Sequence, residues 1–98
     1  MNAERLMEVA LRQARKHATT VLRAQENRMA PEWGINTPLR RLQAMARVLQ
    51  ERIDSAVDKG LASVVFWHGK WLCLAAARAC LAVLEGRIGQ LVPVGAAA

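Results

Sequence analysis

Four side chains of this chain have the chemistry of metal ligands or nucleophiles: His17, His68, Cys73 and Cys80. Metal sites typically supply their ligands as close pairs, such as two cysteines separated by two residues. Here His68 and Cys73 are five positions apart, Cys73 and Cys80 are seven apart, and no fourth ligand is near. The spacing therefore favours buried thiols that pack as small apolar side chains, with His17 as a packing residue. We expect no metal and no cofactor.

Recognisable catalytic signatures are missing from the sequence. It contains no glycine-rich phosphate loop, no nucleophile elbow and no H-E-x-x-H pair. An arginine-lined active site in a helical bundle needs no such motif, and Arg12, Arg40, Arg47 and Arg52 are available to line one. No aligned pattern supports that arrangement. We therefore expect a protein without catalytic residues.

Basic side chains are the other candidates for binding chemistry, because the net charge is +6, with 14 Lys and Arg against 8 Asp and Glu. Four of them, Arg5, Arg12, Lys16 and Arg23, fall within about 40° of one another when the first segment is drawn as a helix. Such a row suits phosphates or an acidic protein partner. An ordinary amphipathic helix also places charge opposite its core, so both interpretations stay open.

Two more arginines, Arg40 and Arg41, fall in the first turn of the second predicted helix. The helix dipole disfavours cations at that position, whereas the exposed backbone N–H groups there favour anions. The pair is therefore a candidate binding site for an anion or an acidic partner. Neutralisation by a nearby acidic residue is the alternative interpretation.

The elements that must position these residues are helical by pattern. Apolar residues recur at steps of three and four over residues 3–29 and again over 38–58, which is typical of amphipathic helices. Pro31 ends the first helix and Gly60 ends the second. We predict an all-α domain of three helices, about 3–29, 38–58 and 61–88, with the first two antiparallel and the third packed across them.

The third segment is unusually apolar. Of the 24 residues from Leu61 to Leu84, 19 are hydrophobic, so a helix here has apolar residues nearly all round. One side would pack on its own chain and the other would need a second cover. We expect a homodimer or partner interface built on Trp67, Trp71, Leu74 and Leu81. The β-branched and aromatic residues around His68-Gly69 also fit a tight hairpin over Ser63–Leu72, and that alternative would place the two tryptophans differently.

The cellular location of the protein and the extent of its domain are indicated by weaker features of the sequence. Glu4, Arg5 and Glu8 interrupt any signal peptide, and the longest uncharged apolar run, Trp71–Ala77, is too short for a transmembrane helix. Two cysteines without a disulfide framework favour a reducing, cytoplasmic setting. We expect one domain over residues 1–93, followed by a disordered tail, 94–98, whose last three alanines resemble a cloning remnant.

These features together predict a non-catalytic protein that acts by occupying a partner protein. Small basic chains of this kind are common among phage and mobile-element accessory proteins, including inhibitors. The alternative is a nucleic-acid-associated regulator that uses the basic row of the first helix. A helix-turn-helix is disfavoured, because the helix after the short Asp58–Gly60 turn would begin Leu-Ala-Ser-Val-Val-Phe-Trp, which cannot read base edges.

Overall fold

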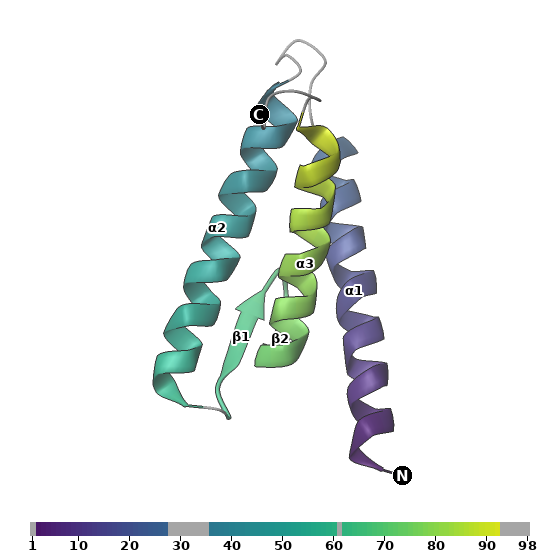
Figure 1. Ribbon diagram of the computed structural model, residues 1–98, viewed down its shortest axis with the longest axis vertical. Helices are drawn as coiled ribbons and strands as arrows, with labels where there is room; N and C mark the ends of the chain where they lie inside the picture. Colours follow the sequence, from purple (N-terminus) through teal and green to yellow (C-terminus); the bar gives the residue numbers. More distant parts are fainter. Residues whose placement is uncertain (1, 28–35, 61, 93–98) are drawn as a thin grey trace.

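The computed structural model describes residues 2–27, 36–60 and 62–92 and contains three helices and a two-stranded hairpin in these ranges. Along the chain they are α1 (Ala3–Asn27), α2 (Asn36–Lys59), β1 (Val64–Trp67), β2 (Lys70–Cys73) and α3 (Leu74–Leu91). In Figure 1, α1 and α2 run in opposite directions and diverge toward one end, with α3 between them and the hairpin between the diverging ends. The protein is therefore mostly helical, as the sequence predicts, with a small sheet added.

Helix α1 begins with a side-chain cap. The Asn2 side-chain Oδ1 accepts a hydrogen bond of 2.8 Å from the backbone N–H of Arg5, which satisfies one of the free donors of the first turn. Ala14, Ala18 and Leu22 of the predicted apolar seam are buried. The predicted last residues of this helix, 28 and 29, lie outside the described residues, as does the predicted tail.

Helix α2 buries one continuous stripe. Its buried residues follow the spacing of three and four that the sequence predicts: Leu42, Ala46, Leu49, Ile53 and Ala56. The helix begins two residues earlier and ends one residue later than predicted. Gly60 then turns the chain with a φ of +123°, a conformation that glycine adopts without a steric penalty.

The hairpin corrects the predicted third helix, which we placed over residues 61–88. β1 and β2 pair antiparallel, with Val65 opposite Leu72 and Trp67 opposite Lys70. His68 and Gly69 form the two-residue turn, and both have positive φ, 46° and 83°. A turn of that kind matches the twist of the two strands, and histidine is among the residues that tolerate this region. The β-branched and aromatic residues of this segment favour strands, and the chain forms strands here in place of the predicted helix.

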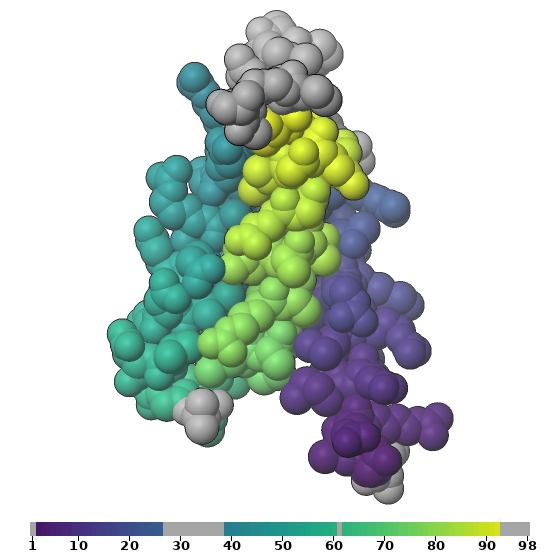
Figure 2. Space-filling view, viewed as in Figure 1, coloured from purple at the N-terminus to yellow at the C-terminus, as the bar shows by residue number. Residues whose placement is uncertain are grey.

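Helix α3 is the central element of the fold. It packs against both α1 and α2, whereas those two helices make little contact with each other. Figure 2 shows α3 lying between them on one face of the molecule. The apolar surface that the sequence distributes around this segment is thus covered within the chain by two helices and the hairpin. Its buried residues are Leu74, Ala76, Ala77, Cys80, Leu81 and Leu84.

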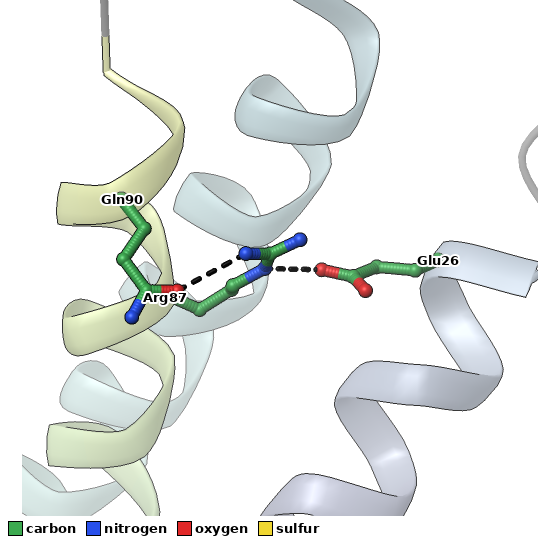
Figure 3. Close-up of polar contacts among 3 residues, drawn as sticks. All are labelled: Glu26, Arg87 and Gln90. Carbon is green, nitrogen blue, oxygen red and sulfur yellow. Dashed lines mark hydrogen bonds and ion pairs between the residues drawn. The ribbon is translucent and has the colours of Figure 1, made fainter.

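Polar contacts join α1 to α3 at two levels. The Cys80 thiol donates to the Ala14 carbonyl oxygen over 3.3 Å, where small side chains let the two backbones come close. Nearer the other end of α3, Arg87 Nε donates to Glu26 Oε1 over 2.7 Å, and its Nη1 donates to Gln90 Oε1 (Figure 3). This ion pair is partly exposed, so its contribution to stability is modest. Among the described residues, none of the helices has the length and apolar character needed to cross a membrane.

Candidate functional site

The hairpin has two faces of different character, because side chains alternate along a strand. Val65, Trp67 and Leu72 point inward and are buried. Val64, Phe66, Trp71 and Cys73 lie on the other face and are exposed. We call these four residues the hairpin outer face. The side chain of Trp71 is 70% exposed and that of Phe66 is 46% exposed, although both are large and apolar.

The two aromatic side chains of the outer face support each other. Phe66 and Trp71 are direct partners in the strand register, and their ring centroids are 4.9 Å apart. Cross-strand aromatic pairs stabilise a sheet and hold each other's side chains in place. Phe66 and Trp71 therefore form a fixed apolar projection on a short two-stranded support, which suits an interface anchor.

The four residues expected at a partner interface separate in the structure. Trp67, Leu74 and Leu81 are buried in the chain's own core, and Trp71 alone of the four is exposed. The expectation assumed a helix, in which Trp67 and Trp71 lie one turn apart on the same side. In the hairpin these two residues alternate to opposite faces, so one tryptophan becomes core and the other surface. Phe66 and Val64 were missed, although alternation around His68-Gly69 was the signal that identifies them.

Trp67 fixes the hairpin to α1. Its side chain is 2% exposed, and the ring of His17 meets it edge-on with centroids 5.5 Å apart. His17 Nε2 also lies 3.2 Å from the Trp67 carbonyl oxygen, which makes it the donor of that hydrogen bond. His17 is therefore a packing residue, as the sequence predicts, but it packs on the hairpin.

A small hollow of about 180 Å³ separates the hairpin outer face from α1. It is lined on the helix by Ala10 and Gln13 and on the hairpin by Lys70, Trp71 and Cys73, among others. Leu6 falls one helical turn before Ala10 on the same side of α1 and is also exposed. The apolar surface thus continues from the hairpin onto the beginning of α1.

The basic row of α1 lies on a different side of that helix. Arg5, Arg12, Lys16 and Arg23 are all exposed, and none of their side chains makes a hydrogen bond or ion pair within the described ranges. Counting 100° per residue, the row points about 110° away from the side that faces the hairpin. Glu4 and Glu8 lie beside Arg5 and Arg12 at its beginning. The row is therefore open to solvent, partly neutralised at one end, and separate from the exposed aromatic residues.

The arginines of α2 do not converge on one point. Arg40 and Arg41 are both exposed near its beginning. Arg47 lies on the side of α2 near Glu85 of α3, whereas Arg52 lies on the side of the hairpin. Arg12 is on the solvent side of another helix. These positions do not form the arginine-lined pocket that the sequence left open.

The thiols and imidazoles are also dispersed. Cys80 is buried, and desolvation raises its pKa to about 11, whereas Cys73, which we expected to be buried, is exposed. Burial, together with the nearby His17 and Arg52, lowers the pKa of His68. Within the described part of the chain, no three residues with histidine, cysteine or carboxylate side chains come together as a metal site.

Comparison with known proteins adds no relative. No protein family, no curated protein and no solved structure matches this chain. The candidate site is therefore defined by its own geometry, and its centre is the hairpin outer face.

Proposed function

We propose that this protein is a non-catalytic binding protein that docks onto a partner protein through the hairpin outer face. The observation that carries the proposal is Trp71, whose side chain is 70% exposed while the contact with Phe66 holds it in place. Exposing a large aromatic side chain to water costs free energy that burial in an interface recovers. Tryptophan is also enriched among the residues that dominate binding energies.

The chemistry available at this face supports binding. Val64, Phe66 and Trp71 contribute apolar area to the hairpin outer face. Cys73 contributes a thiol, and neither His17 nor His68 lies on this face beside it. Occupying a partner requires only complementary shape and apolar contact, which these residues supply. An accessory or inhibitory role, of the kind that phage and mobile-element proteins play, follows from such occupation.

A comparison of two variants tests the proposal. The tagged wild-type protein and the double variant Phe66→Ser/Trp71→Ser are used to capture proteins from a lysate of the source cell, which are then identified by mass spectrometry. Val57→Ser serves as the control, because Val57 is an exposed apolar residue of α2 on the side away from the hairpin. We expect one protein to be captured by the wild type and the control and lost with the double variant. Equal capture by all three contradicts the proposal.

Binding to nucleic acid is the second candidate function. The observation that favours it is the row Arg5, Arg12, Lys16 and Arg23, whose four side chains are exposed and make no described polar contacts. Phosphate binding by such a row weakens steeply with salt, because each neutralised phosphate releases counterions. Titration of random duplex DNA at about 50 and 200 mM salt tests this, with Arg12→Glu/Lys16→Glu as the variant. Absence of binding at the lower salt concentration removes this candidate.

A homodimer is the third arrangement to consider, since the sequence predicts one through Trp67, Trp71, Leu74 and Leu81, of which Trp71 is exposed. A symmetric dimer places the same patch of both copies face to face. Lys59 and Arg52 flank the hairpin, so the two copies would bring like charges together. A partner of different composition therefore fits this face better than a second copy does. Light scattering after gel filtration distinguishes the two.

A further inference from the structure

The partner surface extends from the hairpin along α2. Two open grooves lie side by side between this helix and the hairpin, with volumes of about 420 and 290 Å³. Arg52 lines both of them and lies where they adjoin, and we call the two together the α2–hairpin groove. It extends from Ala44 to Lys59, about 22 Å at the rise of a helix. That length accommodates about seven residues of an extended peptide.

The floor and walls of this groove are mainly apolar. Met45, Val48 and the buried edge of Trp67 line one part. Ala56, Val64, Val65 and Phe66 line the other, where the groove meets the hairpin outer face. The aromatic side chain of Phe66 therefore belongs to both surfaces and joins them.

The charge along this groove has a single sign. Arg52 and Lys59 line it, and no acidic side chain does so among the described residues. The acidic residues of α2, Glu51, Asp54 and Asp58, point about 80° or more away from Arg52 and Lys59 at 100° per residue. Asp54 accepts a hydrogen bond from Gln50, a residue on the side of α2 near Glu85 of α3. Arg52 and Lys59 therefore make the groove lining positive, and the three carboxylates of α2 point away from these two cations.

Arg52 is already positioned to receive an anion. Its Nη1 donates to the Phe66 carbonyl oxygen over 2.8 Å, which fixes the guanidinium beside the hairpin. A guanidinium has five N–H donors, and no other hydrogen bond of this side chain occurs within the described ranges. The remaining donors are available to a carboxylate, which pairs with a guanidinium in a bidentate manner.

We propose that the α2–hairpin groove binds an acidic peptide segment of a partner protein, in which carboxylates alternate with large apolar side chains. This inference rests on the proposed protein-binding function and specifies the chemistry of the partner. The carboxylates pair with Arg52 and Lys59, and the apolar side chains cover Phe66 and Val64. In a symmetric dimer the second copy presents this same groove, which has no acidic residue in its described lining. A nucleic acid finds no flat aromatic surface in the groove, since Trp67 is buried and Phe66 packs against Trp71.

Fluorescence anisotropy with labelled peptides tests this inference. The probe is a peptide of about ten residues in which Glu and Asp alternate with Leu and Phe, long enough to fill the groove. A charge-swapped peptide carries Lys and Arg in place of Glu and Asp. We expect the wild-type protein to bind the acidic peptide, and Lys59→Glu to weaken that binding about tenfold, because an attraction becomes a repulsion. Lys59→Glu should in turn gain affinity for the charge-swapped peptide.

Arg47→Glu is the matched control. It makes the same change of charge on the same helix, but Arg47 lies on the side of α3, away from the groove. We expect this variant to bind the acidic peptide as the wild type does. Circular dichroism of each variant shows that it is folded before binding is measured.

Several outcomes overturn the inference. Lys59→Glu and Arg47→Glu lowering the affinity equally would mean that net charge alone attracts the peptide. Equal binding of both peptides by the wild type, or binding of neither, would exclude an acidic segment. Displacement of the acidic peptide by a labelled oligothymidine would assign the groove to nucleic acid. A molecular mass of two chains, together with burial of Trp71 in that dimer, would assign it to a second copy. The lysate capture tests the protein-binding function separately, because its variant changes Phe66 and Trp71 and leaves Arg52 and Lys59 unchanged.

Discussion

At the scale of single residues, the two cysteines differ most in their surroundings. Cys73 is exposed on the hairpin, whereas Cys80 is buried with its pKa raised to about 11. The thiolate is the reactive form, so burial protects Cys80 both by its pKa and by lack of access. We predict that a disulfide reagent at about pH 8 modifies one thiol per folded chain quickly and the second only in denaturant. Cys73→Ser should remove the fast reaction, and its persistence would contradict the assignment.

His68 makes the stability of the fold depend on pH. Its pKa lies below the ordinary value, first because of burial and then because of the charges of His17 and Arg52. The folded state therefore binds a proton less tightly than the unfolded chain does. The resulting stabilisation is present above the ordinary pKa of about 6.5 and is lost as the pH falls through the lowered value.

The corresponding prediction concerns the free energy of unfolding between pH 8 and pH 5. We expect urea titrations to show that it declines toward the acidic end in the wild type, with a smaller decline in His68→Asn. Asparagine keeps the turn, because it also tolerates a positive φ. His68 is largely exposed, so the difference is small, and raised salt should reduce it further. Identical declines in the two proteins would contradict the role of His68.

At the scale of elements, the hairpin marks the limit of what the sequence predicts. The amphipathic patterns of α1 and α2 come from their own residues, so both helices and the Asn2 cap were predictable. Residues 64–73 contain apolar side chains in nearly every position, and such a run fits either period. The choice depends on the space between α1 and α2, which the sequence alone does not contain. For the same reason the sequence did not predict that Trp67 is buried while Trp71 is exposed, or that Phe66 lies on the exposed face.

Gly69 gives the hairpin a specific test. Its φ is +83°, and a Cβ placed there would have no atom within 4 Å. The cost of Gly69→Ala is therefore backbone strain alone, which we expect to lower the free energy of unfolding by about 1–2 kcal/mol. Gly89→Ala in α3 is the control, because its surroundings are equally open and its φ is helical. There alanine should stabilise by about 0.4–1 kcal/mol. Two losses of similar size would mean that the turn does not have this conformation.

At the scale of the whole molecule, the hairpin assigns core packing to one of its faces and the candidate binding surface to the other. The predicted third helix would have placed both on one element. The inner face of the hairpin fills the space between α1 and α2, which make little direct contact with each other. Its outer face presents Phe66 and Trp71, and Phe66 lies beside Arg52 and Lys59 of α2. One segment therefore both completes the core and carries the candidate binding surface. A substitution on one face should therefore leave the contribution of the other face, to stability or to binding, measurable.

The two tryptophans of the hairpin test this division. Trp67 is 2% exposed, meets His17 of α1 and lines the groove with Met45 of α2, so Trp67→Ala should lower the free energy of unfolding by about 3–5 kcal/mol. A domain of this size has only about 5–15 kcal/mol in total, so the variant is expected to lose a large part of its stability. Trp71→Ala removes an exposed ring and should change the same quantity by less than about 1 kcal/mol.

Urea titrations followed by circular dichroism compare the two variants without relying on tryptophan fluorescence. The same samples of Trp71→Ala should fail to capture the partner although they are folded, because the lost ring belongs to the interface and not to the core. If Trp71→Ala instead unfolds as Trp67→Ala does, the outer face is part of the core. Phe66 and Trp71 would then no longer indicate a partner-binding surface, and the basic row of α1 would become the stronger candidate site.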